Sequence, residues 1–275
     1  MADDGVVLEA AGHQLTLTHP DKVFFAERGE TKLDLVRYYE AVAGPLLAAI
    51  GGRPVLLQRF PNGAGNQSFF QKRVPALRPE WLQTAVVSTP NGTTSDALVV
   101  ADLAHVYWAV NLACLGFHVW PTRAADLEHA DELRIDLDPR ELERRRPDLI
   151  TAAWWKEERG TRVFVDFNQN APHKTIFGAW SVRARAGAQV STPFGWDELA
   201  TIDIDALTMV TVPARVAEAG DPWSAMDAAP QSLEPVLDLH RRDQAAGLSD
   251  APWPPVYPKM PGEPPRVAPS RAKKT

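Results

Sequence analysis

The chain has 275 residues, of which 45% are hydrophobic and 23% charged, with a formal net charge of −6. This is the composition of an ordinary globular protein, and the acidic total argues against a protein that coats nucleic acid without specificity. The single cysteine, Cys114, excludes an internal disulfide, and the lack of a signal-peptide pattern or an apolar run of ~18 residues leads us to expect a cytoplasmic protein.

Strands and helices alternate along the first half of the chain. Thr31 has the side chain of an N-cap, and Asp34 would lie in the first turn of the helix that follows it. Apolar residues at helical spacing predict a later helix that closes on Gly116. The elements expected here are a strand over 13–22, helices over 32–50 and 102–116, a buried strand over 53–60 and a Gly/Asn loop over 61–68.

The second half continues the alternation. Its expected elements are strands over 117–121, 132–138 and 162–167, a short helix over 140–146, and a strand pair or hairpin over 181–187 and 188–193. This interleaving predicts a mixed α/β fold. Residues 251–275 are rich in proline and end in basic residues, which is typical of an extended tail rather than a packed domain.

Three aspartates fall on the predicted strands. Asp136 and Asp138 alternate with apolar residues, so their side chains share one strand face, with Cα atoms ~6.6 Å apart. Asp166 interrupts a β-prone run, where an acid is costly unless it is paired or metal-bound. On neighbouring strands the three could hold two divalent ions for phosphate chemistry. The alternative is that the first two mark a strand end that reaches solvent.

Ordered motifs along nearly the whole chain point to one family. They include "LTHPDKVFF", "GETKLDLVRYY", "RFPNGAGNQSFFQKR", "FHVWPTR", "DELRIDLDP", "WWKEERGTRVFVDFNQNA" and "VSTPFGWDEL". The sequence resembles the archaeo-eukaryotic primase superfamily, in particular the polymerase domain of bacterial ligase D and its stand-alone actinobacterial relatives. The resemblance implies a primase-polymerase-like sheet with flanking helices over residues 1–250, with a smaller N-terminal α/β portion over about 1–100 and a catalytic sheet over about 101–250.

The resemblance also implies roles for single residues. The positions that match the catalytic ligands of two Mn²⁺ or Mg²⁺ ions are Asp136, Asp138 and Asp166. The positions that match those holding the incoming nucleotide are His118, Arg159, Gln169 and Arg183. Arg185 shares a predicted strand face with Arg183 and could take its place. Without the family, His118 is equally explained as a satisfied, partly buried imidazole, and the two arginines as a solvated face.

Two lysines and two phenylalanines complete the expected DNA site. Lys22 and Lys32 match lysines that grip the 5′-phosphate of the downstream strand, and Phe69 and Phe70 match an aromatic pair that supports the template base. Cations near a helix start suit a phosphate, and aromatics among cations suit single-strand stacking. The alternatives are two solvated lysines and two core phenylalanines.

One motif of the family is missing. Relatives carry S-G-x-x-G-x-H between the D-x-D strand and the third aspartate, where it binds the triphosphate. This chain has no Ser-Gly dipeptide, and only 15 residues separate Asp138 from Trp154. We therefore expect a shortened connection after Asp138 and an incomplete triphosphate cradle.

The expected function is DNA-dependent nucleotidyl transfer that fills or extends DNA ends in non-homologous end joining. It would use an NTP or dNTP on gaps or ends with a 5′-phosphate, in the bacterial cytoplasm near the nucleoid, with Ku and a DNA ligase as possible partners. One alternative is a catalytically inactive DNA-end-binding paralogue. A haloacid dehalogenase-like phosphatase matches poorly, because its motif needs D-x-D-x-T.

Overall fold

The computed structural model describes residues 5–88, 93–132, 146–151, 153, 156–164, 174–226 and 228–247. The chain forms two compact units that divide between Pro230 and Gln231. The predicted strand over 132–138 and helix over 140–146 lie outside the described residues except for one end residue each, and the strand over 162–167 is described only to Phe164. The expected border at residue 250 remains a prediction.

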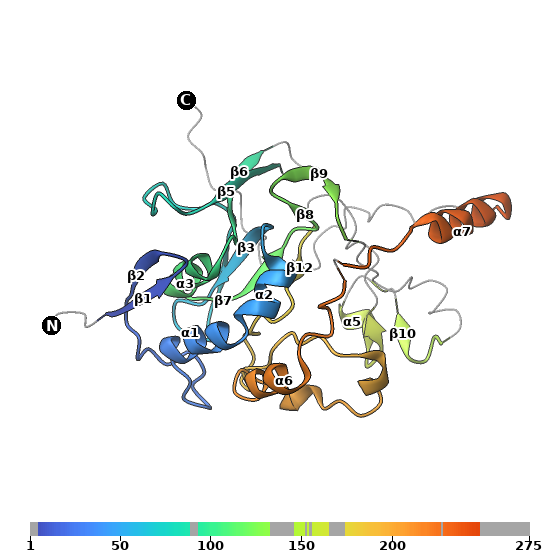
Figure 1. Ribbon diagram of the computed structural model, residues 1–275. Helices are drawn as coiled ribbons and strands as arrows, with labels where there is room; N and C mark the ends of the chain where they lie inside the picture. Colours follow the sequence, from blue (N-terminus) through green and yellow to red (C-terminus); the bar gives the residue numbers. More distant parts are fainter. Residues whose placement is uncertain are drawn as a thin grey trace. The chain divides into compact units, whose positions relative to one another are not determined.

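An antiparallel sheet forms the centre of the first unit (Figure 1). Its strands run in the order β12–β7–β3–β6–β5, and β4 pairs with β3 on a separate branch. The strands are β3 (Pro54–Arg59), β4 (Phe69–Gln71), β5 (Thr84–Ser88), β6 (Thr94–Val99), β7 (Cys114–Val119) and β12 (Ile176–Phe177). Two of the predicted strands, over 53–60 and 117–121, are therefore confirmed as neighbours in the middle of this sheet.

Shorter elements surround the sheet. The remaining strand pairs are β1 (Val6–Ala10) with β2 (His13–Leu17), β8 (Thr122–Arg123) with β9 (Asp126–Ala130), and β10 (Ile150–Thr151) parallel to β11 (Val163–Phe164). The helices of the first unit are α1 (Lys32–Ala41), α2 (Ala43–Ile50), α3 (Leu103–Asn111), α5 (Lys156–Arg159) and α6 (Val212–Ala219), with 3₁₀ turns at Trp196–Glu198 and Ile204–Ala206. The second unit contains α7 (Glu234–Ala245). The mixed α/β class is confirmed.

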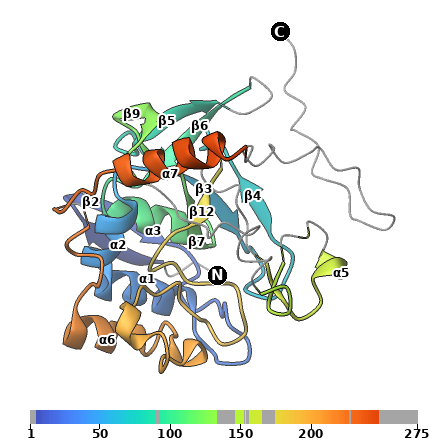
Figure 2. The same cartoon turned by 90° about the vertical axis from the view of Figure 1, so that its right-hand side faces the viewer.

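One face of the sheet is covered by helices, and the other carries the candidate site. Helices α1, α2 and α3 lie together on one side of the strands (Figure 2). Along β7, Phe117 and Val119 are buried whereas His118 between them is only half-buried. Phe117 packs edge-on against Tyr39 of α1, with ring centroids 5.8 Å apart. Because neighbouring strand residues point to opposite faces, His118 projects from the face away from α1.

The range 32–50 was predicted as one continuous helix, and this prediction is wrong, because the range forms two helices, α1 and α2. Its start is confirmed: Thr31 accepts a hydrogen bond from Asp34 N, and the Asp34 carboxylate accepts one from Thr31 N. The break falls at Val42, which leaves helical geometry with φ −109° and ψ 17°. Pro45 follows in the first turn of α2, where its missing N–H does no harm, but its ring would clash with a carbonyl of a continuous helix.

The predicted helix over 102–116 ends earlier than expected. Helix α3 stops at Asn111, Ala113 adopts a left-handed φ of 63°, and β7 begins at Cys114. Gly116, expected as the helix end, instead pairs with Gln58 in the sheet. Pairing with β3 therefore overrides the helical spacing of the apolar residues. Cys114, expected in the core, is fully buried there, and burial raises the pKa of its thiol to about 12.

The expected pair over 181–187 and 188–193 forms a narrow antiparallel contact. Val182 bridges Val190, and Arg183 N donates to Gln189 O at 2.8 Å. Trp180, just before it, is fully buried, and its carbonyl accepts a hydrogen bond from the Tyr38 hydroxyl. These contacts join the segment to α1. Within the residues that the structure describes, no helix is long and apolar enough to cross a membrane.

Candidate nucleotide and DNA site

The acids expected to bind metal cannot be placed. Asp136, Asp138 and Asp166, together with Gln169 of the expected nucleotide site, lie outside the described residues, and their roles stay predictions. Across the described ranges, no three His, Cys, Asp or Glu side chains come together in a way that could hold a metal ion.

A buried arginine anchors the chain just before the D-x-D segment. The Arg53 side chain is almost fully buried, and its guanidinium nitrogens lie 2.9 Å from Asp131 Oδ2 and 3.2 Å from Glu132 Oε2. Arg123 contacts the same Asp131 carboxylate. Burial acts to raise the pKa of Asp131, but hydrogen bonds from both arginines lower it overall. Asp131 and Glu132 are thus tied to Arg53, the residue just before β3.

His118 lies at the centre of a cluster on the open face of the sheet. Its ring meets Phe70 of β4 and Phe177 of β12 edge-on, at centroid distances of 5.2 and 5.1 Å. Its Nε2 is 3.4 Å from Gln58 Oε1. Burial, and then the charge of Arg183, lower the pKa of His118 to about 4. The imidazole is therefore neutral at physiological pH and suited to hydrogen bonding rather than to charge neutralisation.

Arg183 brings a positive charge to this cluster. Its guanidinium carbon lies 4.6 Å from the centre of the Phe177 ring, and one terminal nitrogen donates to Ser191 Oγ at 3.3 Å. Burial, followed by repulsion from Arg185, lowers its pKa. Within the described part of the chain, no carboxylate lies within ion-pair distance of Arg183. Arg185 is exposed, and of the two arginines it is Arg183 whose charge acts on His118.

The two adjacent phenylalanines are on the surface, which contradicts the alternative that they are core residues. Phe69 is 45% exposed and Phe70 52% exposed. They point to opposite faces of β4, so that Phe70 reaches His118 while Phe69 lies under the Arg59 guanidinium at 5.1 Å. Exposed aromatic faces beside cations are the usual platform for unpaired bases. Their role with a template strand remains a prediction.

The two lysines lie close together but differ in exposure. Lys32 N donates to Lys22 O at 2.8 Å, which joins the helix start to the turn. Lys32 is 4% exposed, and its Nζ donates to Thr18 O at 2.7 Å and to Asn111 Oδ1 at 2.8 Å. Lys22 is exposed, and its Nζ donates to Pro61 O at the start of the Gly/Asn loop. Lys22 is therefore the better placed of the two for a terminal phosphate, and the paired role stays a prediction.

The Gly/Asn loop connects Lys22 to the aromatic pair. Gly63 has a φ of +89°, and an added Cβ would lie 3.0 Å from Phe24 O. The next residue, Ala64, donates its N–H to the same carbonyl at 2.7 Å. A left-handed residue this close to another backbone favours glycine. The loop thus holds the turn containing Lys22 next to the segment that leads into Phe69.

Arg159 lies outside the central sheet, on the short helix α5. It ends this helix, and its guanidinium covers the ring of Phe164 at 3.5 Å from the centroid. Its Nε donates to Ala153 O at 3.0 Å. These contacts fix the side chain against β11, the strand whose predicted continuation carries Asp166. Its role with a nucleotide remains a prediction.

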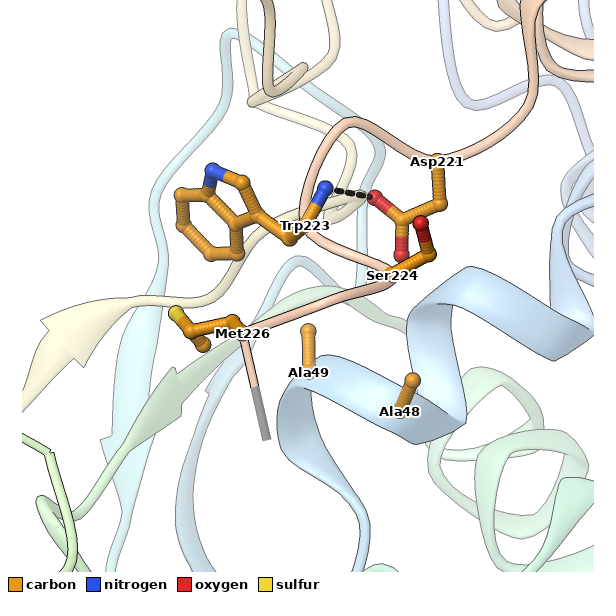
Figure 3. A pocket seen from close by; sticks show the side chains of 6 residues that line it. All are labelled: Ala48, Ala49, Asp221, Trp223, Ser224 and Met226. Atoms are coloured by element: carbon orange, nitrogen blue, oxygen red, sulfur yellow. Dashed lines mark hydrogen bonds between the residues drawn. The ribbon is translucent and has the colours of Figure 1, made fainter. Parts of the chain in front are cut away.

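One small cavity lies away from these residues. It measures about 40 Å³ and is bounded by α2 and the segment after α6 (Figure 3). The lining residues are Ala48, Ala49, Asp221, Trp223, Ser224 and Met226. This space can hold a few water molecules at most and has no cationic side chain in its lining, so it cannot take a nucleotide.

Sequence reasoning missed three members of the His118 cluster: Gln58, Phe177 and Ser191. Gln58 could have been found from the sequence, because it places a polar side chain on the same strand face as Leu56 in the otherwise apolar run "PVLLQR". Phe177 could not have been found from the sequence, because its position beside His118 depends on the pairing of β12 with β7. That pairing joins residues almost sixty positions apart.

Comparison with protein families gives one match that covers most of the chain. The family described as LigD, primase-polymerase domain, matches residues 31–142 and 140–223. The match therefore falls into two segments that meet at residues 140–142, where the sequence predicts a shortened connection. The motifs from Lys32 to Arg183 all lie within the matched segments.

Curated relatives and a solved structure agree with that match. The multifunctional non-homologous end joining protein LigD of Mycolicibacterium smegmatis is 27% identical over 309 aligned positions, covering 90% of this chain and 40% of the relative. The corresponding DNA repair protein LigD of Mycobacterium tuberculosis is 28% identical over 318 positions, covering 90% and 42%. The chain thus spans less than half of each relative. Both alignments are longer than the chain, so each relative has residues without a counterpart here.

The solved structure is the polymerase domain from Mycobacterium tuberculosis ligase D in complex with DNA. It superposes with a TM-score of 0.68 at 26% sequence identity, covering 78% of this chain and 99% of that one. The similarity therefore extends over nearly the whole of that domain.

Proposed function

Because the chain belongs to the family of LigD primase-polymerase domains, we propose that it binds DNA ends or gaps and adds nucleotides to them during non-homologous end joining. The reaction would be attack of a DNA 3′-hydroxyl on the α-phosphate of an NTP or dNTP. Two divalent ions would supply the Lewis-acid chemistry that lowers the hydroxyl pKa and stabilises the developing charge.

The observation that carries this proposal is the cluster on the open sheet face. The exposed ring of Phe70 contacts the neutral imidazole of His118, which contacts Phe177, and Phe177 in turn contacts the half-buried guanidinium of Arg183. A half-buried guanidinium is stabilised by an anionic partner, and a phosphate oxygen is well suited to that role. His118 and Arg183 would thus contact the nucleotide, and Phe70 the template base beside it.

The acids would complete the site. Asp136, Asp138 and Asp166 are the candidates for holding Mn²⁺ or Mg²⁺, since carboxylates two residues apart on a strand can bridge two ions. If this is right, Asp166→Ala should lower Mn²⁺ affinity as much as Asp136→Ala does. Titration of Mn²⁺ followed by water-proton relaxation measures this directly. Unchanged affinity in Asp166→Ala would mean that the third acid lies elsewhere.

The experiment that tests the function is templated extension of a gapped duplex with a 5′-phosphate, supplied with Mn²⁺ and each NTP or dNTP. We expect template-dependent addition that is lost in Asp136→Ala and strongly reduced in Arg183→Ala. Addition that ignores the template base, or that survives Asp136→Ala, would contradict the proposal. Ku and a DNA ligase are proposed partners only because the relatives are end-joining proteins.

A second candidate function is DNA-end binding without catalysis. It is favoured by the break of the family match at residues 140–142 and by the extra residues of the relatives. The missing S-G-x-x-G-x-H motif would have supplied two or three charge-assisted contacts to the triphosphate, each worth ~1.5–3 kcal/mol. DNA binding that depends on Lys22 and Phe70, with no extension under any metal or nucleotide, would identify this second function.

A further inference from the structure

Phe177 is the least expected member of the His118 cluster, because its ring occupies space that a side chain on β7 would normally take. An added Cβ at Gly116 would lie 2.9 Å from Phe177 Cε2 and 2.8 Å from Val182 O, and it would also collide with Phe177 Cζ. The backbone of Gly116 is not left-handed, so the glycine is needed there for space and not for conformation. Gly116 and Phe177 therefore form a matched pair across β7 and β12.

The ring has two polar neighbours on the site side. The Arg183 guanidinium lies over it, 4.6 Å from the centroid, and the His118 imidazole meets it edge-on at 5.1 Å and 86°. Among the described residues, the side chain of Arg183 also makes a long hydrogen bond of 3.3 Å to Ser191 Oγ. The contact with the Phe177 ring is thus the main described restraint on the position of the guanidinium.

We propose that Phe177 is a positioning residue of the nucleotide site, which orients the Arg183 guanidinium toward a phosphate and keeps water away from His118. The inference rests on the proposed function, since it assigns to Arg183 a phosphate of the incoming nucleotide. A stacked guanidinium keeps its N–H edge free, so the ring fixes the plane while the donors stay available for a bidentate contact. Because this chain lacks the S-G-x-x-G-x-H motif, phosphate binding should depend on the orientation of Arg183 more than it does in relatives that have the motif.

Three substitutions separate positioning from mere packing. Phe177→Leu keeps most of the volume and removes the π face, whereas Phe177→Tyr keeps both. Ile176→Ala is the matched control, because Ile176 is the neighbouring residue of β12, is 40% exposed and points to the opposite face. The measurements are affinity for inorganic tripolyphosphate by calorimetry and the pKa of His118 by NMR.

We expect Phe177→Leu to bind tripolyphosphate roughly five- to thirtyfold more weakly, as expected for the loss of a partly desolvated cation–π contact. The pKa of His118 should rise from about 4 toward its ordinary value, because the imidazole gains water and Arg183 moves away. Phe177→Tyr and Ile176→Ala should match the parent chain in both measurements. Equal affinity and an unchanged His118 pKa in Phe177→Leu would overturn the proposal.

The parent chain itself provides an independent test. Stacking over Phe177 should shift the side-chain proton resonances of Arg183 upfield, and a normal shift would overturn the proposal even if Phe177→Leu failed to fold. If the parent chain binds no tripolyphosphate, the proposed nucleotide function is contradicted. The Arg183 shift and the His118 pKa would then still decide whether Phe177 positions these two residues.

Discussion

At the scale of single residues, His118 makes stability depend on pH. Its pKa of about 4 in the folded protein lies below the ~6.5 of an unfolded chain, so between these values the unfolded state binds more protons. The contribution of His118 to the free energy of unfolding should therefore be fully present above about pH 6.5 and be lost as the pH drops toward 4. Because the ring is only half-buried, we expect a loss on the order of 1–2 kcal/mol, less than full linkage.

The measurement is urea unfolding of the parent chain and of His118→Asn at several pH values. The difference in unfolding free energy between the two should shrink by this amount from pH 7 to pH 4. Arg183 is the charged group that contributes to the shift, so Arg183→Gln should weaken the pH dependence. Parallel pH profiles for the parent chain and His118→Asn would show that another group is responsible.

Phe70 should matter more for binding of single strands than for binding of duplex. Its side chain is 52% exposed, and stacking on an unpaired base is worth ~1–3 kcal/mol. We expect Phe70→Ala to weaken binding of a template overhang with little change for blunt duplex, and to lower the Tm modestly because about half of the side chain is buried. Val86→Ala, at an exposed apolar position on β5, is the control. Equal losses on both DNAs would argue against base stacking.

Lys22 and Lys32 should behave differently when substituted. Lys22→Ala should reduce the preference for a 5′-phosphorylated gap and leave Tm unchanged, because its side chain is exposed. Lys32→Met should cost roughly 1–3 kcal/mol of stability, since Thr18 O and Asn111 Oδ1 would lose a buried donor. Fluorescence anisotropy at fixed salt and thermal melting measure the two effects.

The control for Lys22 is Arg37→Ala, which removes the same charge from an exposed position on α1. It should change neither the phosphate preference nor the Tm by a comparable amount. If Lys32→Met kept its stability and lost the phosphate preference, then Lys32 would be the phosphate ligand and its buried contacts would have to open when DNA binds.

At the scale of elements, the connection after Asp138 decides how well a triphosphate is held. We expect the parent chain to bind DNA ends but to extend them far more slowly than a relative with the complete motif. Inserting the relative's segment between Pro139 and Arg140 should restore extension, because it returns the missing charge-assisted contacts. A Gly/Ser insert of the same length is the control. Fast extension by the parent chain would mean that another loop binds the triphosphate.

The sequence predicted those elements that are determined locally. The N-cap at Thr31 and the buried strand over 53–60 depend on neighbours within a few residues, and both are confirmed. The helix expected over 102–116 was wrong at its end, because sheet pairing competes with helical spacing there. Strands β5 and β6 were missed although they pair with each other as a local hairpin, because their polar residues obscure the alternation.

The candidate site likewise contains residues that the sequence predicted and residues whose positions depend on distant parts of the chain. His118, Phe70 and Arg183 were found from motifs, and the structure brings them together. Phe177 could not be found this way, because its role comes from the register that places it opposite His118. Lys32 was expected at the surface or on a phosphate, but its burial depends on Thr18 and Asn111, which are distant in sequence.

At the scale of the whole molecule, the net charge of −6 and the exposed cations have opposite effects on DNA binding. A negative total disfavours sliding on intact duplex, so binding should depend on a few local contacts at an end or gap. Lys72 and Arg73, which follow Phe69 and Phe70 closely in sequence, are exposed, and so is Lys22, which contacts the start of the Gly/Asn loop. This arrangement suits a protein that selects broken DNA over the large excess of unbroken DNA.

The hydrogen bonds of Tyr38 and Tyr39 also have a consequence for how the protein is made. Tyr38 Oη donates to Trp180 O, 142 residues later in the chain, and Val182 N donates to Tyr39 Oη across 143 residues. At the usual ~5–20 residues per second of translation, roughly 7–30 s pass before these partners leave the ribosome. During that time the apolar residues that Trp180 covers remain open. The nascent chain is therefore expected to need chaperones until Trp180 and Val182 have left the ribosome.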